Sequence, residues 1–361
     1  MKLLAALSGG VDSAVAAALA AEAGHEVTAI HMALMRHRAE VRSGSRGCCS
    51  IEDASDARRA ADLLGLPFYV WDLSQDFEQQ VVTDFLAEYQ AGRTPNPCVR
   101  CNEHIKFATL AKRAAALGFD GVCTGHYARS IADDAGPHLR RAAHRAKDQS
   151  YVLAAAGPAG LARAVFPLGA MPSKDEVRRQ AQLRGLPVAA KPDSYDICFI
   201  PDGDTRGFLA GHLGAAPGPI LDEAGQQVGE HSGCYGFTIG QRHGLGLPHT
   251  APDGRPRYVT RIDAATATVH VGPAEALAME RLSASGAVWF EPVPPGPFAA
   301  EVQIRAHGRP IAAHVTPSDD RGRLTVELTE SIRATAPGQT VVLYRPDPAR
   351  GDEVIAAATI D

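Results

Sequence analysis

The sequence predicts an α/β fold: a doubly wound parallel sheet, then a small central β-rich domain, then a C-terminal antiparallel β-barrel. Three observations carry this prediction. Strand and helix patterns alternate up to about residue 200, glycines punctuate the chain from Gly203 onward, and short alternating strands recur at regular spacing after Pro297. Because 361 residues exceed what one ordinary core holds, we place the domains at residues 1–203, 204–275 and 276–361.

The first strand-to-helix turn predicts an anion-binding loop. An apolar strand over 2–7 passes directly into an Ala-rich helix over 11–23, through Leu7-Ser8-Gly9-Gly10-Val11-Asp12-Ser13. The glycines let backbone N–H groups approach an anion at the positive end of that helix, which points to a nucleotide. No lysine follows the glycines, so kinase or GTPase chemistry is disfavoured. The loop looks like the pyrophosphate loop (PP-loop) of ATP-dependent enzymes that transfer AMP to a substrate oxygen.

The rest of the first domain continues the alternation. Two capping boxes, Ser50-x-x-Asp53 and Ser173-x-x-Glu176, mark helix starts. Ligands of such sheets bind beyond the carboxyl ends of the strands, which is where Met32, Gly125 and His126 lie. Strands are predicted over 27–31, 68–72 and 121–124, and helices over 50–65, 77–90, 105–117 and 173–185.

The last two domains are predicted to be β-rich. Glycines between residues 218 and 246 divide the central domain into turns and short strands. Regularly spaced runs that alternate apolar and polar residues then predict a small antiparallel barrel. These runs cover 298–306, 311–316, 323–329, 339–344 and 353–360.

Composition predicts a cytosolic protein without a membrane partner. The apolar stretch from Ala14 to Ala21 stops at Glu22, well short of a membrane span. Seven cysteines in a reducing compartment are more consistent with catalytic, metal-binding or buried thiols than with disulfides. The net charge of −5 does not indicate a nucleic-acid partner. Two basic clusters in predicted loops, at 36–46 and 140–147, are either phosphate-binding or simply solvated surface.

The cysteines indicate sulfur chemistry. Cys98 and Cys101 follow the proline-stiffened loop Thr94-Pro95-Asn96-Pro97 and are predicted to be loop-borne, and Cys198 follows much later. A persulfide on one cysteine can attack an electrophilic carbon, and a second thiolate can then release the transferred sulfur by exchange. Adenylation would turn the carbonyl oxygen into a good leaving group. The Cys-x-x-Cys motif alone is equally compatible with a metal or redox site.

Motifs along nearly the whole chain resemble the tRNA-specific 2-thiouridylases, bacterial enzymes that replace the 2-oxygen of the wobble uridine by sulfur. The resemblance implies an adenylating α/β domain, a central domain and a β-barrel. The matching segments are residues 8–13, Gly92-Arg93-Thr94-Pro95-Asn96-Pro97, Cys101-Asn102, Ile105-Lys106-Phe107, Thr124-Gly125-His126-Tyr127, Lys147-Asp148-Gln149-Ser150-Tyr151, Lys191-Pro192-Asp193-Ser194, Ile197-Cys198-Phe199-Ile200 and Thr238-Ile239-Gly240-Gln241-Arg242.

The resemblance also implies roles for individual residues. Cys198 corresponds to the persulfide carrier and Cys101 to the thiolate that completes transfer, and Asp12 lies near the Mg²⁺ that accompanies pyrophosphate. The ATP-binding positions are Ala6, Leu7, Ser8, Gly9, Gly10, Val11, Asp12, Ser13, Met32 and Gly125. The tRNA-binding positions are Asn96, Pro97, Cys98, His126, Lys147, Asp148, Gln149, Arg305 and Gln339. The implied acceptors are lysine, glutamate and glutamine tRNAs, and the implied sulfur donor is a cysteine desulfurase or a sulfur-relay protein.

Three departures from the family pattern leave alternatives open. Many relatives carry Asp at the position of Cys98, Arg305 is followed by Ala306 where relatives have Tyr, and Cys48-Cys49 has no role that we can derive. The additional thiol raises the hypothesis that Cys98, Cys101 and Cys198 hold an iron–sulfur cluster that delivers the sulfur. Another PP-loop adenylating enzyme that acts on tRNA and a noncatalytic RNA-binding module are the rival functions.

Overall fold

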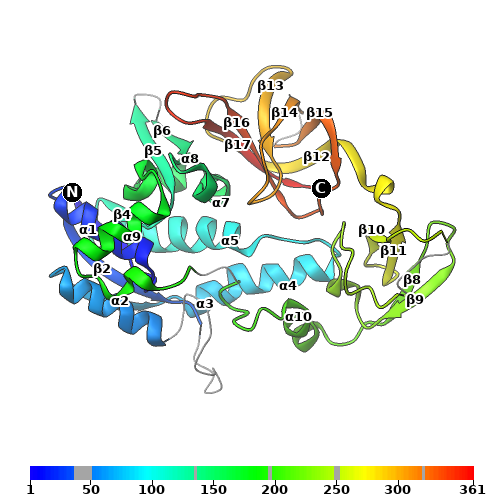
Figure 1. The fold of residues 1–361 in the computed structure, drawn as a ribbon. Helices are drawn as coiled ribbons and strands as arrows, with labels where there is room; N and C mark the ends of the chain where they lie inside the picture. Colours follow the sequence, from blue (N-terminus) through cyan, green and yellow to red (C-terminus); the bar gives the residue numbers. More distant parts are fainter. Residues whose placement is uncertain (36–50, 134–135, 194–196, 248–252, 319–321) are drawn as a thin grey trace.

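The fold consists of three sheets arranged as three domains (Figure 1). The structure is a computed structural model that describes residues 1–361 except 36–50, 134–135, 194–196, 248–252 and 319–321. In Figure 1 the N-terminal sheet lies at the left, the C-terminal barrel at the upper right and the central domain at the lower right, with α4 and α5 running between them. No helix within the described ranges is long and apolar enough to cross a membrane.

The N-terminal sheet is parallel and doubly wound, as predicted. Its strand order is β3-β2-β1-β4-β7, and every neighbouring pair is parallel. On β1, Leu3 and Ala5 pack with helix α1 on one face, whereas Leu4 and Ala6 pack with Leu110 on the other. Full burial of Leu3 and Leu4 contributes about 2 kcal/mol each. The strands are β1 (Lys2–Ala6), β2 (Glu26–Ala33), β3 (Phe68–Asp72), β4 (Gly121–Cys123) and β7 (Ala164–Val165).

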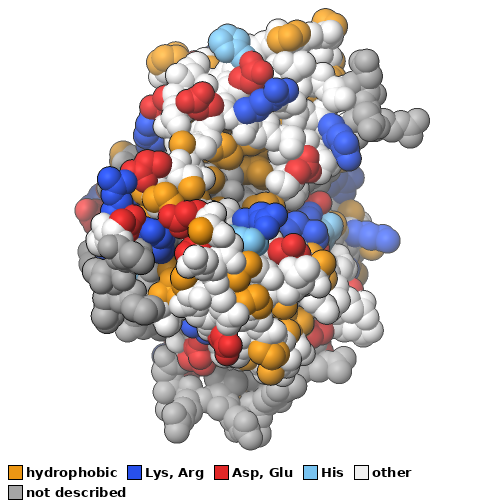
Figure 2. Space-filling model, turned by 90° about the vertical axis from the view of Figure 1, so that its right-hand side faces the viewer, with side chains coloured by type: hydrophobic (Ala, Val, Ile, Leu, Met, Phe, Trp, Pro, Cys, Tyr) orange, Lys and Arg blue, Asp and Glu red, His pale blue; other side chains and the backbone are white. Residues whose placement is uncertain are grey.

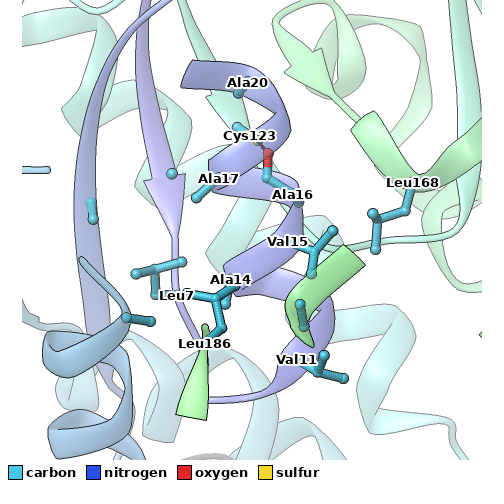
Figure 3. Close-up of a cluster of buried hydrophobic side chains, with 14 of the residues drawn as sticks. Leu7, Val11, Ala14, Val15, Ala16, Ala17, Ala20, Cys123, Leu168 and Leu186 are labelled. Atoms are coloured by element: carbon cyan, nitrogen blue, oxygen red, sulfur yellow. Dashed lines mark hydrogen bonds between the residues drawn. The ribbon is translucent and has the colours of Figure 1, made fainter. Parts of the chain in front are cut away.

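Small side chains bring helix α1 (Val11–Glu22) close to the sheet. Figure 3 shows Ala14, Ala16, Ala17 and Ala20 of this helix inside the cluster, with the Cys123 thiol donating to the Ala16 carbonyl oxygen at 3.7 Å. Burial raises the pKa of Cys123 to about 12, so this thiol stays protonated and is a packing residue. The Ala-rich pattern therefore serves close helix-to-sheet packing beneath the loop.

Two of the predicted helices, 77–90 and 105–117, begin earlier than predicted, at Ser74 and Pro97. Residues Ser74–Gln90 form one run made of α3, η1 and α4, and residues Pro97–Ala116 form another made of α5, η2 and α6. The α-helices of the domain are α1, α2 (Ile51–Leu63), α3 (Ser74–Phe77), α4 (Thr83–Gln90), α5 (Pro97–Arg100), α6 (Ala111–Ala116), α7 (Ser150–Leu153), α8 (Gly157–Leu161) and α9 (Lys174–Leu183). The π-helical segments are η1 (Glu78–Val82) and η2 (Cys101–Leu110), and the 3₁₀ segments are η3 (Arg145–Lys147), η4 (Ala154–Ala156), η5 (Pro167–Ala170) and η6 (Pro187–Ala190).

The predicted loop position of Cys98 and Cys101 is wrong, because both lie in the second helical run. The Asn96 side chain accepts a hydrogen bond from the backbone N–H of Cys98 at 3.0 Å, and Pro97 occupies the first helical position. Asparagine at the cap and proline directly after it are strong helix-start signals. Of the two predicted capping boxes, the one at α9 is present as a serine cap, because the Ser173 side chain accepts from the backbone N–H of Glu176. The Glu176 carboxylate bonds to Arg179 and Gln180. Ser50, which begins the first box, lies outside the described residues.

The C-terminal domain is a closed antiparallel barrel. It closes because β12 pairs with both β15 and β17. The five predicted strands are present, and β12 was not predicted. The strands are β12 (Ala278–Trp289), β13 (Phe298–Gln303), β14 (Ile311–Pro317), β15 (Leu324–Arg333), β16 (Thr340–Arg345) and β17 (Glu353–Ile360). The core contains inward-facing residues such as Val302, Val326 and Leu343.

The central domain contains a small sheet in the order β10-β11-β8-β9 around Ile220, Val259 and Val269. Helix α10 (Thr205–Leu213) leads into it, capped by the Asp204 side chain. The strands are β8 (Gly218–Leu221), β9 (Gln227–His231), β10 (Tyr258–Asp263) and β11 (Thr268–Gly272), and the 3₁₀ segments here and before the barrel are η7 (Cys234–Gly236) and η8 (Ala274–Leu277).

An unpredicted hairpin joins the first domain to the barrel. Strands β5 (Ala128–Asp133) and β6 (Gly136–Arg141) pair with each other, and β6 also pairs with β17. Arg140 is 8% exposed and bonds to Asp347 and Glu353, so its predicted place in an exposed basic loop is wrong. Arg141 is 5% exposed and its guanidinium lies 3.7 Å from the Tyr344 ring centre. Both arginines therefore stabilise the junction between domains.

Candidate active site

The loop after β1 has the geometry of an anion cradle. Gly9 has a φ of +76°, and a Cβ there would lie 2.3 Å from the backbone oxygen of Asp53, so only glycine fits. The Ser13 hydroxyl accepts from the backbone N–H of Ser8 at 3.1 Å and donates to the Gly10 carbonyl at 3.0 Å. These bonds fix the loop directly before the N-terminus of α1, where an anion is stabilised.

The end of β4 packs tightly on this loop. A Cβ at Gly125 would lie 2.6 Å from the backbone nitrogen of Ser13 and 2.7 Å from the backbone carbon of Asp12. Met32, at the end of β2, packs partly buried next to the same sheet edge. The fold therefore brings together the positions predicted to bind ATP: Ala6, Leu7, Ser8, Gly9, Gly10, Val11, Asp12, Ser13, Met32 and Gly125.

Asp12 sits in a polar cluster at the mouth of the loop. Its two carboxylate oxygens accept hydrogen bonds from the Lys174 ammonium at 2.7 and 2.6 Å. The Tyr127 hydroxyl donates to Asp12 at 2.7 Å. Burial and the neighbouring Asp12 carboxylate raise the pKa of Tyr127, so the phenol remains a hydrogen-bond donor.

Asp193 ties three cations to the same cluster. Its carboxylate accepts from Lys147 at 2.7 Å and from Arg178 at 3.1 Å, and it pairs with Lys174 at 2.9 Å. Although burial opposes ionisation, the hydrogen bonds from Lys147 and Lys174 lower the pKa of Asp193 to about 2. The carboxylate is therefore charged throughout the physiological pH range, and it holds these cations beside the loop.

Lys191 fixes the other side of the loop. Its ammonium donates to the Gly9 carbonyl at 3.0 Å, to Asp53 at 2.8 Å and to Asp56 at 2.6 Å. Burial opposes the charged form, but the two carboxylates of helix α2 prevail and raise the pKa of Lys191. A small hollow borders this side, lined by Gly9, Gly10 and Asp56 among others. Lys191 therefore links α2 to the glycine loop.

Two of the three predicted sulfur-handling residues share one apolar environment next to the loop. Cys101 is 8% exposed and Cys198 is half-buried, and both belong to a cluster that Met32 borders. Cys98, in contrast, is exposed on the first turn of α5. The aromatic members of the cluster are Phe77, Phe85, Phe199, Phe208, Tyr89 and Tyr235. Two thiols in one apolar cluster that Met32 borders suit sulfur transfer better than they suit a surface redox motif.

The thiols are not grouped as metal ligands. Within the described ranges, no three His, Cys, Asp or Glu side chains are arranged to hold a metal ion. The different environments of exposed Cys98 and buried Cys101 do not fit a shared iron–sulfur cluster, and we derive no step through one. Cys48 and Cys49 lie outside the described residues.

Comparisons with known proteins decide the family. The family model described as "tRNA methyl transferase HUP domain" matches residues 1–202, "tRNA methyl transferase PRC-barrel domain" matches 206–273, and "Aminomethyltransferase beta-barrel domain" matches 279–360. The chain is 60% identical to the tRNA-specific 2-thiouridylase MnmA of Beutenbergia cavernae, over 100% of this chain and 96% of that one. It is 59% identical to the protein of the same name from Kineococcus radiotolerans, over 100% and 98% of the two chains. This chain belongs to the tRNA-specific 2-thiouridylase family.

The predicted tRNA contacts of this 2-thiouridylase lie in two groups. Asn96, Pro97 and Cys98 start α5, and the barrel reaches this group because the Gln339 side chain donates to the Thr94 carbonyl oxygen. A small cavity between α5 and the barrel is lined by residues from both, including Asn96. Arg305, which follows β13 of the barrel, donates to the Ala334 carbonyl at 2.7 Å. The second group, His126 and residues 147–149, adjoins the Asp12 cluster.

Within the second group the side chains point into the 2-thiouridylase rather than outward. Asp148 accepts from the Ser150 hydroxyl at 2.7 Å and from the backbone N–H of Ala142 at 2.8 Å, and its side chain is 4% exposed. The Gln149 side chain accepts from the backbone N–H of Tyr127 at 2.9 Å. On the face drawn in Figure 2, Lys and Arg side chains intermingle with Asp and Glu.

His126 is enclosed between aromatic rings. Its Nδ1 lies 2.8 Å from the Thr124 hydroxyl, and its ring is 6.0 Å from each of Phe107 and Phe166. Burial, and then the neighbouring Lys106 ammonium, hold the pKa of His126 well below its ordinary value of 6.5. The imidazole is therefore neutral in the folded protein at neutral pH.

We expect His126 to make folding stability depend on pH. In the unfolded chain His126 takes up a proton near pH 6.5, whereas in the folded protein it stays neutral at that pH. The contribution of neutral His126 to the free energy of unfolding is therefore complete above pH 6.5 and is lost as the pH falls below it. Relative to His126→Gln, the wild type should lose up to about 1.4 kcal/mol of unfolding free energy per pH unit below that point. Urea unfolding at several pH values measures this slope. The exposed His243→Gln variant is the control, and equal slopes for His126→Gln and wild type would contradict the expectation.

Sequence reasoning missed the residues that surround Asp12, above all Lys174 and Tyr127. Tyr127 and Asp193 lie inside motifs that were recognised but received no role, and Lys174 follows the Ser173 cap directly. One signal was available for Lys174. A lysine at the first position of a helix opposes the helix dipole, which favours acidic residues there.

Proposed function

We propose that this chain 2-thiolates the wobble uridine of lysine, glutamate and glutamine tRNAs in the cytosol, with ATP as the activating substrate. The observation that carries the proposal is the placement of Cys101 and Cys198 in one apolar cluster that borders the PP-loop edge through Met32. A sulfur carrier and a resolving thiol must both reach the atom that the nucleotide activates. The family's full-length relatives support the tRNA substrate.

The first step would be adenylation of the uracil 2-oxygen. The N-terminus of α1 and the Ser8 and Ser13 groups are suited to binding the β- and γ-phosphates, which leave as pyrophosphate. Asp12 is the carboxylate best placed to hold Mg²⁺, which commonly takes one or two protein carboxylates together with phosphates and water. Bound Mg²⁺ would supply charge neutralisation of the pyrophosphate. The 2-oxygen thereby becomes part of AMP, a good leaving group.

The second step would be sulfur transfer through Cys198. A cysteine desulfurase or a sulfur-relay protein loads Cys198 as a persulfide, whose terminal sulfur attacks C2 and expels AMP. The product is a C2–S–S–Cys198 bridge. The Cys101 thiolate then attacks the Cys198 sulfur, the bridge breaks, and 2-thiouridine leaves with a Cys101–Cys198 disulfide behind it. A cellular thiol reductant restores both cysteines for the next cycle.

Replacement of Cys101 by serine is expected to trap the sulfur bridge. Without the second thiolate the tRNA stays bonded to Cys198, so a protein–tRNA adduct accumulates to about one per enzyme and dithiothreitol releases it as thiolated tRNA. A denaturing gel without reductant measures the adduct. Cys98→Ser is the control, and it should behave as wild type. Repeated thiolation turnover by Cys101→Ser without added reductant would contradict the proposed role.

Three alternatives to this proposal remain: the same thiolation by iron–sulfur chemistry, another adenylating tRNA enzyme, and methyl transfer. The iron–sulfur version of the same thiolation requires Cys98 as a ligand, which its exposed position does not favour. Another adenylating tRNA enzyme, or the methyl transfer that the family-model descriptions name, requires neither Cys101 nor Cys198. The pairing of these two thiols with the loop therefore favours persulfide-dependent thiolation.

The proposal is tested by thiolation of lysine tRNA with reduced, iron-free protein, ATP, Mg²⁺, cysteine and a desulfurase. Thiolated tRNA is retarded on a gel that contains mercury. A retarded band that requires ATP is the expected result. A band that forms only after anaerobic cluster reconstitution would transfer the sulfur chemistry to iron, and no band under either condition would refute thiolation.

A further inference from the structure

Lys174 occupies a position that local structure disfavours. It is the first residue of α9, directly after the Ser173 cap, where the helix dipole repels a cation. Its side chain is nevertheless 12% exposed, and it is directed at the first turn of a different helix, α1. A buried ammonium costs free energy unless it is paired, so the site as a whole must stabilise it.

The pairing places Lys174 at the mouth of the glycine loop. The Nζ atom lies 2.7 and 2.6 Å from the two oxygens of Asp12 and 2.9 Å from Asp193. Asp12 is the second residue of α1, so the ammonium lies beside the helix end where the loop would receive phosphate. P-loop enzymes have a lysine directly after their glycines for this purpose, and this loop has none.

The partners of the two lysines near the loop differ. The Lys174 ammonium lies 2.7 and 2.6 Å from the two carboxylate oxygens of Asp12, a residue of the first turn of α1. The Lys191 ammonium instead pairs with two carboxylates of α2, Asp53 and Asp56, on the opposite side of the loop. Lys174 is therefore the lysine that lies beside the N-terminal turn of α1, where an anion is stabilised.

We propose that Lys174 binds the β- and γ-phosphates of ATP at this loop and supplies in space the lysine that the loop lacks in sequence. The inference rests on the ATP use described under Proposed function. In the nucleotide-free protein Asp12 neutralises Lys174. When Mg²⁺ and ATP enter, Lys174 exchanges the Asp12 carboxylate for phosphate oxygens, and Asp12 becomes available to the metal ion.

The exchange predicts effects that depend on the phosphate chain. Lys174→Met should weaken the binding of Mg·ATP on the order of ten- to a hundredfold, the range for a lost charge-assisted hydrogen bond, and should leave AMP binding unchanged. Lys174→Arg keeps the charge and should retain the preference for ATP over AMP. Arg179→Met removes a cation from the same helix, where Arg179 is 57% exposed and pairs with Glu176, and it should bind both nucleotides as wild type does.

Asp12→Asn gives a test in the opposite direction. Without Mg²⁺, the only expected role of Asp12 is competition with phosphate for Lys174, so its removal should tighten the binding of metal-free inorganic pyrophosphate about tenfold, while Lys174→Met should weaken it. This variant also tests the proposal if Lys174→Met does not fold.

The measurement is equilibrium binding of Mg·ATP, AMP and metal-free pyrophosphate to the full-length protein by isothermal titration calorimetry, with melting temperatures as the check on folding. The expected result is a selective loss for Lys174→Met together with the gain for Asp12→Asn. Equal losses for ATP and AMP, unchanged ATP binding by a folded Lys174→Met, or no gain in Asp12→Asn would each overturn the proposal. If the wild-type protein binds no ATP, the proposed function is refuted. If the wild type binds ATP and thiolates tRNA, a contrary result for the variants refutes only the proposal for Lys174.

Discussion

Replacement of Cys198 by serine is expected to abolish tRNA thiolation, by about 10³-fold or more, while tRNA-dependent pyrophosphate release continues. The size of the effect follows from the loss of the covalent sulfur carrier, because a hydroxyl cannot hold a persulfide. Release of pyrophosphate precedes sulfur transfer in the proposed sequence and depends on the loop residues around Asp12. The two activities are measured on the same sample, by mercury gel for thiolation and by a coupled phosphate assay for pyrophosphate.

Cys98→Ser provides the matched control for this experiment. Cys98 is exposed on α5, only one helical turn from Cys101, and the persulfide route does not use it. We expect this variant to thiolate tRNA as wild type does. Loss of thiolation in both Cys98→Ser and Cys198→Ser would favour a cluster that needs three thiols, and sustained thiolation in Cys198→Ser would rule out Cys198 as the carrier.

The sheet and the loop could be predicted because their signals are local. Apolar strands followed by helices specified β1, β2, β3 and β4, and the Ser-Gly-Gly turn was correctly placed between the carboxyl end of β1 and the N-terminus of α1. Each of these features depends on residues within a few positions of one another. The Ser173 cap of α9 was predictable for the same reason.

The errors have two causes: a local signal that was misinterpreted, and contacts that distant residues decide. Asn96 and Pro97 form a strong helix start, yet two prolines in four residues were interpreted as a loop, so Cys98 and Cys101 were misplaced. Arg140 and Arg141 are buried only because barrel residues such as Glu353 and Tyr344 pair with them across the domain junction. A basic sequence gives no indication of such partners.

The position of Lys174 next to Asp12 could not be predicted from the sequence either. Its partner Asp12 lies more than 160 positions earlier in the chain, and the two meet only because α9 packs against α1 on one face of the sheet. The loop has no lysine after its glycines, and this absence disfavoured kinase or GTPase chemistry. The packing of α9 against α1 brings the Lys174 ammonium next to the loop. A motif that lacks a lysine can therefore still have a lysine ammonium beside it in the folded protein.

The second large effect is expected for Gly125→Ala, which should reduce tRNA-dependent pyrophosphate release on the order of a hundredfold. An added Cβ would lie 2.6 Å from the backbone nitrogen of Ser13 and 2.7 Å from the backbone carbon of Asp12. Neither atom belongs to a flexible side chain, so the first turn of α1 must move away from β4 by about 1 Å, a displacement that strongly impairs catalysis when it affects a binding group.

Gly211→Ala is the matched control, because a Cβ at Gly211 meets nothing within 4 Å and the residue lies inside helix α10. Alanine there should preserve activity and stabilise the helix by about 0.5–1 kcal/mol. Pyrophosphate release and ATP affinity are measured for both variants, with thermal unfolding to separate displacement from global unfolding. A folded Gly125→Ala protein that releases pyrophosphate at the wild-type rate would mean that the loop tolerates the displacement. The close approach of β4 to α1 would then be a packing feature rather than a requirement of the adenylation site.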